Sequence, residues 1–184
     1  MNKSILVPIA DGTEEMEVVT IVDILRRAGV FVTFAGLSAK VVCSRGVEII
    51  PDILIDDLSD DAEFDMIVLP GGMKGVKNLS ESKKLEAIIK HNKNKAVIAA
   101  ICAAPLILKA FGLLDSDIQI TSHPSVKDEF ADYDYQDSNV VISRNIVTSR
   151  GAGTAAGFSL TLVELLFDKS ISERIARDIV FVGN

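Results

Sequence analysis

Apolar stretches alternate along the chain with polar and glycine-containing connections, and their spacing predicts strands and helices in turn. The predicted strands cover residues 4–10, 30–37, 40–43, 47–55, 65–69, 96–101, 118–122, 139–143 and 146–149. The predicted helices cover residues 14–28 (with Thr13 as the N-cap), 79–94, 103–111, 125–131, 158–167 and 171–180. Because strands that alternate with helices form parallel sheets, we expect a single α/β domain over residues 1–184. Its mostly parallel sheet should carry helices on both faces, with a small appended hairpin at residues 40–55.

Residues 95–108 read as a buried strand that turns directly into a helix. The unbroken apolar run 96–101 is typical of a parallel strand covered on both faces, and Pro105 fits the first turn of the helix. Cys102 lies at the turn, where the N-terminus of a helix favours thiolate over thiol. The alternative is a buried structural cysteine, since free cysteines are often buried.

Several polar or glycine-containing segments follow predicted strands. They are the loop 11–17, the pair Gly71-Gly72, the turn at Cys102 and the corner His123-Pro124. In open parallel sheets, ligands bind beyond the carboxyl ends of the strands. We therefore expect these segments to line one crevice, with Cys102 as the nucleophile.

Each neighbour of Cys102 in this crevice has two interpretations. Gly71 and Gly72 can aim N–H groups at a developing oxyanion, or they form a tight turn. His123 is a general base or proton shuttle, or it caps its loop. The second histidine, His91, lies late in a lysine-rich helix and is expected to be solvated.

One carboxylate of the first helix is favoured for this crevice. Glu17 shares a helical face with Ile21 and Ile24, and burial of a carboxyl group raises its pKa. Glu14 lies on the same stripe less well, and Glu15 points elsewhere. Periodicity alone favours Glu17 only modestly.

The segment 151–157 has the form G-x-G-x-x-x-G, follows a predicted strand and opens a helix. This pattern is similar to a dinucleotide-binding loop. However, no further strand–helix units follow it to complete a nucleotide-binding half. We interpret these glycines as close packing of the helix 158–167 against the sheet.

The composition excludes several classes of function. With 184 residues, a net charge of -7 and a pI of about 4.8, the chain is not expected to bind nucleic acid or an anionic membrane. The N-terminus reads as a first strand rather than a signal peptide. Cys43 and Cys102, far apart, suggest neither a disulfide framework nor a zinc site. We expect a reduced cytoplasmic protein with no metal and no cofactor.

Seven short motifs, in order along nearly the whole chain, resemble the ThiJ/PfpI superfamily. They are DGTEEME (residues 11–17), RRAG (26–29), CSRGV (43–47), LPGG (69–72), AAICAAP (99–105), TSHP (121–124) and TSRGAGT (148–154). The set is most similar to the branch of the parkinsonism-associated deglycase, called DJ-one, and its bacterial relatives.

This resemblance implies a flavodoxin-like three-layer sandwich and a homodimer. It also implies roles for particular residues, all at matching motif positions. Cys102 would be the nucleophile, Glu17 a protonated partner of its sulfur, and His123 the active-site histidine. Gly71, Gly72 and Ala103 would supply backbone N–H groups, and a pocket arginine that reaches across the dimer would be Arg45 or, second, Arg27. The chain departs from some members at Ala104, where they have glycine, and it offers no obvious acid behind His123.

The function that the resemblance implies is cofactor-free detoxification of glyoxal and methylglyoxal, or repair of the adducts that they form on proteins. The partners would be small reactive aldehydes or glycated proteins. A non-enzymatic redox-sensing chaperone that uses an oxidisable Cys102 is the alternative. A cysteine peptidase is the least favoured reading, because Ala103 stands where that branch has a histidine.

Overall fold

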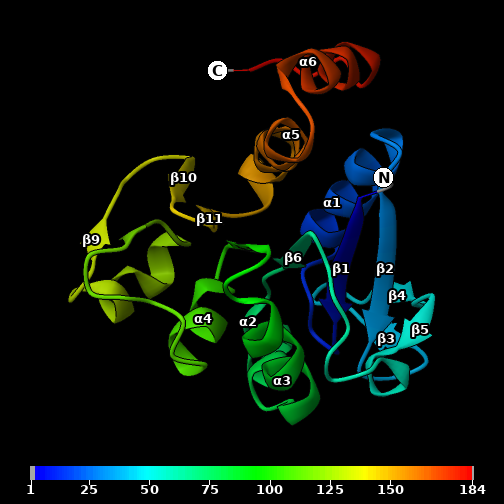
Figure 1. Cartoon of the computed structure of the whole chain (residues 1–184), viewed down its shortest axis with the longest axis vertical. Helices are drawn as coiled ribbons and strands as arrows, with labels where there is room; N and C mark the ends of the chain where they lie inside the picture. Colours follow the sequence, from blue (N-terminus) through cyan, green and yellow to red (C-terminus); the bar gives the residue numbers. More distant parts are fainter. Residues whose placement is uncertain (1–2, 184) are drawn as a thin grey trace.

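Residues 3–183 are described by a computed structural model, in which seven strands form one central sheet (Figure 1). Across the sheet the strands follow the order β10-β11-β7-β6-β1-β2-β5. Their bounds are β1 Ser4–Ile9, β2 Phe31–Gly36, β5 Ile53–Leu54, β6 Met66–Leu69, β7 Val97–Ile101, β10 Val140–Ser143 and β11 Ile146–Ser149. Every neighbouring pair is parallel except β10 and β11. The prediction of a mostly parallel sheet is confirmed.

Helices cover both faces of this sheet (Figure 1). One face carries α1 Glu15–Arg27, α5 Ala155–Leu166 and α6 Lys169–Asp178, and the other carries α2 Met73–Ser80, α3 Lys83–Asn92 and α4 Pro105–Ala110. Alternation along β1 explains the two cores: Ile5, Val7 and Ile9 pack on the first face, and Leu6 packs on the second. Three short 3-10 helices complete the helical segments: η1 Ile55–Asp57, η2 Pro124–Phe130 and η3 Ala152–Thr154.

Helix α1 begins at Glu15, one residue later than expected with Thr13 as the N-cap. Glu14, not Thr13, is the N-cap, and its side chain accepts the N–H of Met16. The hydroxyl of Thr13 instead accepts the N–H of Ala10, which closes the turn after β1. Gly29, with φ of 79°, ends the helix as expected.

The predicted helix at residues 79–94 corresponds to α3, and its first two residues instead end α2. Ser82 separates them, because its side chain accepts the N–H of Leu85 and caps α3. The expected inner stripe of Leu85, Ile88 and Ile89 is fully buried. Helix α2 follows Gly72 directly, so it places its first turn at the carboxyl end of β6.

Two predicted strands differ from the structure. The segment 47–55 contains β4 Glu48–Ile49, which forms the expected hairpin with β3 Val41–Val42, and also β5, which joins the main sheet beside β2. The segment 118–122 contains only β8 Gln119–Ile120, which pairs with β9 Asp134–Tyr135 outside the main sheet. These strands have two residues each, too few to be placed by a pattern with a period of two.

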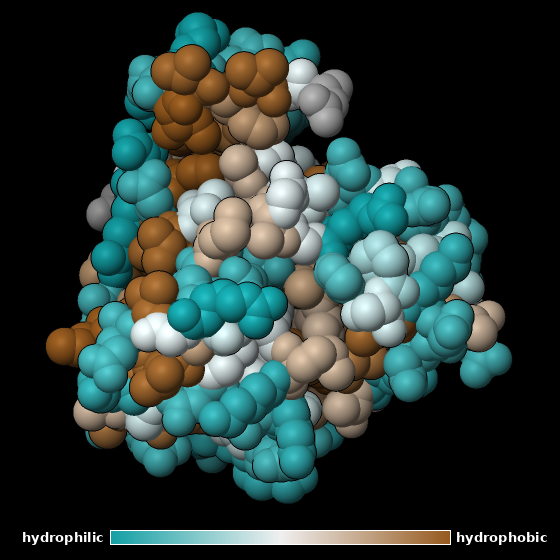
Figure 2. Space-filling model, turned by 180° about the vertical axis from the view of Figure 1, so that it is seen from behind, coloured by the Kyte–Doolittle hydropathy of each residue, from teal (hydrophilic) through white to brown (hydrophobic). Residues whose placement is uncertain are grey.

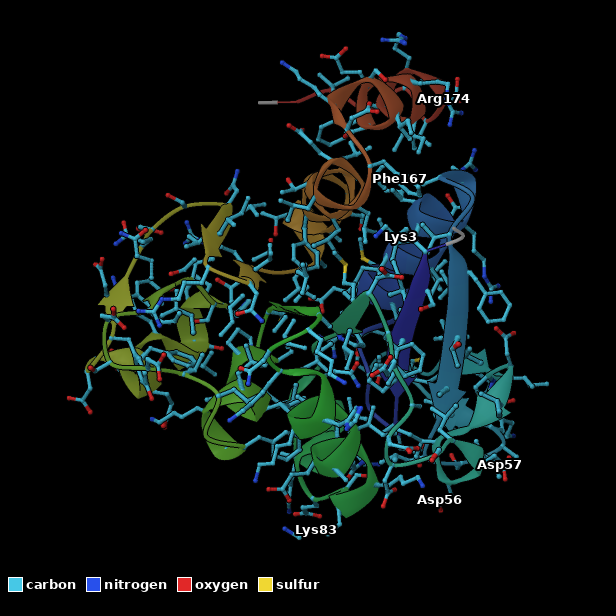
Figure 3. The ribbon with its side chains drawn as sticks, viewed as in Figure 1. Lys3, Asp56, Asp57, Lys83, Phe167 and Arg174 are labelled. Atoms are coloured by element: carbon cyan, nitrogen blue, oxygen red, sulfur yellow. The ribbon has the colours of Figure 1, made fainter. Side chains whose placement is uncertain are left out.

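The acidic segment after β5 lies on the surface, as expected. Figure 3 shows Asp56 and Asp57 at the edge of the molecule, and both side chains are exposed.

Within residues 3–183, the helices are too short or too polar to cross a bilayer.

Candidate active site

Cys102 lies at the sharp turn where β7 ends. Its φ is 64°, in the left-handed region that residues with a side chain rarely adopt. Two main-chain hydrogen bonds hold it there. Its N–H donates to Ser149 O of β11 at 3.0 Å, and its carbonyl accepts the N–H of His123 at 2.8 Å. A strained residue held by its surroundings is a sign of a functional site, so the nucleophilic interpretation of Cys102 is favoured over the structural one.

Glu17 lies in the first turn of α1 and is fully buried. Its Oε2 accepts the N–H of Gly71 at 2.7 Å, while Oε1 is buried without a hydrogen-bond partner among the described residues. Burial raises the pKa of this carboxyl group to about 7, although hydrogen bonds from Gly71 and Cys102 act in the opposite direction. An unpartnered buried oxygen makes the ionised form costly, which agrees with the expected protonated glutamate.

The lack of a side chain on Gly71 allows the sulfur of Cys102 and the carboxyl group of Glu17 to lie close together. A Cβ on this residue would lie 2.5 Å from Cys102 Cβ, 2.7 Å from Glu17 Oε2 and 3.0 Å from Cys102 Sγ. No other residue type fits there. Because the N–H of Gly71 is bound to Glu17, it is not free to bind an oxyanion, and that expectation was wrong.

Neighbouring groups shift the pKa of the Cys102 thiol in opposite directions. Burial, and then the charge of Glu17 and a hydrogen bond with it, raise the pKa of the thiol. The N–H groups of Gly72 and Ala103 face the sulfur and lower its pKa. Moving a proton from the thiol to Glu17 removes the charge repulsion and leaves the thiolate facing both N–H groups. Helix α4 contributes less than expected, because it begins only at Pro105 and has six residues.

His123 caps its loop and also lines the cavity, whereas its role as a general base or proton shuttle stays a prediction. Its ring caps η2 by accepting the N–H of Ser125 on Nδ1 at 3.2 Å, and Ser125 Oγ lies 2.8 Å from the same nitrogen. Nothing in the sequence marks Ser125 beyond its position next to His123-Pro124. His91, as expected, lies at the surface beside Glu63.

Gly151 also belongs to the site. A Cβ on it would lie 3.3 Å from His123 Cδ2 and 4.0 Å from Cys102 Sγ. The interpretation of segment 151–157 as packing of a helix against the sheet was therefore wrong. Gly153 has open space around it, and Gly157 faces Phe181 near the end of the chain.

A cavity of about 340 Å³ joins these groups. It is lined by Glu14, Glu17, Ser44, Arg45, Gly72, Met73, Cys102, Ala103, His123, Ser125 and Ala152. Glu15 lies behind its wall and accepts the hydroxyl of Ser44 and the N–H of Arg45, which fixes the β3–β4 turn at the cavity mouth.

The two candidate arginines differ. The exposed side chain of Arg45 lines the cavity. Arg27 lies at the last turn of α1 and pairs with Asp23 on the surface. Because Glu17 occupies the opposite end of α1, Arg27 does not line the cavity of its own chain, and a reach across a dimer into the partner's pocket stays a prediction.

Known proteins with similar sequences and structures identify the family of this chain. A family model described as DJ-1/PfpI family matches residues 3–165. The chain belongs to the DJ-1/PfpI family. A Parkinson disease protein 7 homolog of Danio rerio is 41% identical, with 97% of each chain covered. The crystal structure of Drosophila melanogaster DJ-1beta superposes with a TM-score of 0.94 at 40% identity and covers 100% of both chains. The resemblance to the DJ-one branch and the expected fold class are thus confirmed.

One relative has a name that describes an activity. The protein DJR-1.2 of Caenorhabditis elegans, named a glutathione-independent glyoxalase, is 40% identical over 88% of this chain and 87% of its own length. At the level of the family, this name supports an enzyme activity.

Proposed function

We propose that this protein is a cysteine-dependent enzyme that converts methylglyoxal and glyoxal, or their adducts, without a cofactor. The observation that carries the proposal is the contact between Cys102 and Glu17 across Gly71, with a carboxyl pKa of about 7. A group with this pKa both accepts and returns protons at neutral pH. The glyoxalase name of the Caenorhabditis elegans relative supports the same chemistry.

The proposed reaction begins with attack of the Cys102 sulfur on the aldehyde carbon of methylglyoxal. The thiol proton passes to Glu17 and from there to the carbonyl oxygen, which gives a hemithioacetal. Glu17 then removes the proton from the same carbon, and a proton returns to the neighbouring carbon through an enediol. The product is a lactoyl thioester, which water hydrolyses to lactate and the free thiol. The net reaction is methylglyoxal plus water to lactate.

Deglycase activity uses the same groups on a different substrate. Early adducts of methylglyoxal on cysteine, lysine or arginine side chains carry the same carbon skeleton, so that the site would release the amine or thiol and form lactate. The cavity opens to solvent beside Arg45 and Ser125, both at its rim, which would admit an adduct on a protein surface.

The test is lactate formation from methylglyoxal by the purified protein without glutathione. We expect turnover by the wild type and none by Cys102→Ser. Cys43→Ser is the matched control, because Cys43 is buried outside the catalytic cavity, and it should keep wild-type turnover. Lactate formation by the wild type no faster than by Cys102→Ser would refute the proposal.

A second candidate function is a sensor of oxidative stress, with or without chaperone activity. The N–H groups of Gly72 and Ala103 that face the sulfur would also stabilise the oxygens of a sulfinate, and Glu17 could donate a hydrogen bond to it. Mass spectrometry after mild peroxide treatment should find two added oxygens on Cys102 before any on Cys43. Earlier oxidation of Cys43 would exclude this role.

A homodimer in the cytoplasm is part of the proposal. Apolar side chains are exposed on α1, on the β3–β4 hairpin and its flank, and from the end of α5 onward: Met16, Val19, Val42, Val47, Ile50, Leu165, Phe167, Val180, Phe181 and Val182. Figure 2 shows apolar patches that extend from the C-terminal region down one side of the molecule. Patches of this kind mark interfaces between proteins. Both cysteines are free, which fits a reducing compartment.

A further inference from the structure

We propose that Ser125 is a positioning residue that holds His123 as the tautomer protonated on Nε2, so that this N–H donates a hydrogen bond to the substrate oxygen at Cys102. The role of His123 as donor rests on the proposed function, whereas the tautomer itself does not. The inference comes from the hydrogen bonds around one ring nitrogen.

Nδ1 of His123 faces two groups of Ser125. The main-chain N–H of Ser125 lies 3.2 Å from Nδ1, and Ser125 Oγ lies 2.8 Å from it. A main-chain N–H can only donate, so Nδ1 must present its lone pair. The hydroxyl can add a second donor to the same lone pair. In a neutral ring, the proton therefore belongs on Nε2.

The main chain fixes this ring beside the nucleophile. The N–H of His123 donates to Cys102 O at 2.8 Å. The ring edge at Cδ2, the atom bonded to Nε2, and the sulfur of Cys102 both lie within 4.0 Å of the point that a Gly151 Cβ would occupy. His123, Ser125 and Cys102 line the same cavity.

The site also needs a donor for the substrate oxygen. Gly71, the expected oxyanion donor, gives its N–H to Glu17. The N–H groups of Gly72 and Ala103 face the sulfur of Cys102. Nε2–H of His123 is a side-chain donor at the rim of this cavity that neither of these interactions occupies.

The tautomer can be measured without any turnover. In protein labelled with 15N on histidine, His91→Gln removes the signals of the other histidine, and the remaining ring signals belong to His123. We expect Nδ1 to be the unprotonated nitrogen and Nε2 the protonated one at a pH where the ring is neutral. A proton on Nδ1 would overturn the proposal, whether or not the protein is a glyoxalase.

Ser125→Ala and Ser125→Thr test the positioning. Ser125→Ala keeps the main-chain contact at 3.2 Å and loses the shorter hydroxyl contact at 2.8 Å. The share of the minor tautomer should therefore rise in the same spectrum, and kcat should fall by about threefold to tenfold with KM little changed. Threonine keeps the hydroxyl and should restore both readouts. An unchanged tautomer and kcat in Ser125→Ala would contradict a positioning role for this side chain.

Three variants of His123 separate a donor from a base. The amide N–H of glutamine reaches the position of Nε2, whereas asparagine is shorter and alanine has no donor. We expect His123→Gln to keep lactate formation within about tenfold of wild type, and His123→Asn and His123→Ala to lose about 100-fold, as for other oxyanion donors. Equal loss in all three would show that His123 does not act as a donor.

Discussion

Glu17 accepts the main-chain N–H of Gly71 at 2.7 Å from a position with no solvent exposure. This bond holds the carboxyl group against Cys102, because Gly71 has no side chain to separate them. It also occupies only one carboxyl oxygen, and the other is buried without a partner among residues 3–183. The arrangement favours a proton on Glu17, and this property can be tested through stability, labelling and activity.

Replacement of Glu17 by glutamine should change how stability depends on pH. The folded pKa of Glu17 is raised from 4.5 to about 7, so that its contribution is fully present below pH 4.5 and is lost as the pH rises through 7. The expected loss is about 3 kcal/mol, from 1.36 kcal/mol for each pKa unit. Glutamine does not titrate.

Urea unfolding of wild type and Glu17→Gln at pH 4.5, 6 and 8 measures this difference. The free energy of unfolding of the wild type, relative to that of the variant, should fall over this range. Parallel curves for the two proteins would show that Glu17 titrates in the folded state as it does in the unfolded chain.

Gly71→Ala should disable the site. The added Cβ would lie within 3.0 Å of two side chains, those of Cys102 and Glu17, and overpacking of this kind costs about 1–3 kcal/mol. We expect a lower melting temperature and loss of lactate formation. Gly153→Ala is the matched control, because a Cβ there meets nothing within 4 Å, and both measurements should stay at wild-type values. A fully active Gly71→Ala would mean that the sulfur and the carboxyl group need not be in contact.

The two cysteines should differ in reactivity in the folded protein. Cys43 is 5% exposed, so that a labelling reagent has little access to its thiol in the folded protein. Cys102 is half-buried and opens on the cavity. Iodoacetamide at pH 7.5 should therefore label Cys102 first and Cys43 only after unfolding. Peptide mass spectrometry over time follows both sites, and simultaneous labelling would place Cys43 outside the core.

Arg45→Ala and Arg27→Ala should have different effects on substrate binding. The side chain of Arg45 lines the cavity, whereas Arg27 pairs with Asp23 on the surface. We expect Arg45→Ala to raise KM for methylglyoxal by about threefold to tenfold, as for the loss of one hydrogen bond to substrate. Arg27→Ala should leave KM unchanged. An increase of KM in Arg27→Ala alone would reverse the assignment.

Much of the site follows from the sequence, because the carboxyl ends of parallel strands share one edge. Cys102, Gly72 and His123 each follow a predicted strand, and Glu17 lies on the inner stripe of the first helix. Both features are local, so they can be recognised without the fold. The same rule also predicted that His123 lies beside Cys102, although β8 lies outside the main sheet. The two residues are close because the main-chain N–H of His123 donates directly to Cys102 O.

The predictions that were wrong concerned contacts between residues that are far apart in the sequence. The N–H of Gly71 had two potential partners, and only the rotation of α1 shows that Glu17 takes it. The role of Gly151 depends on the approach of His123, 28 positions earlier in the chain. None of these distances is encoded in a periodic pattern.

The central claim is that Cys102 and Glu17 act as one unit, and a double-mutant cycle tests it most directly. Lactate formation from methylglyoxal would be measured as kcat/KM for wild type, Cys102→Ser, Glu17→Gln and the double variant. Residues that act as a unit are strongly non-additive. The account predicts that each single variant falls close to background and that the double variant falls no further. Losses that multiply in the double variant, or turnover by Glu17→Gln at the wild-type rate, would contradict it.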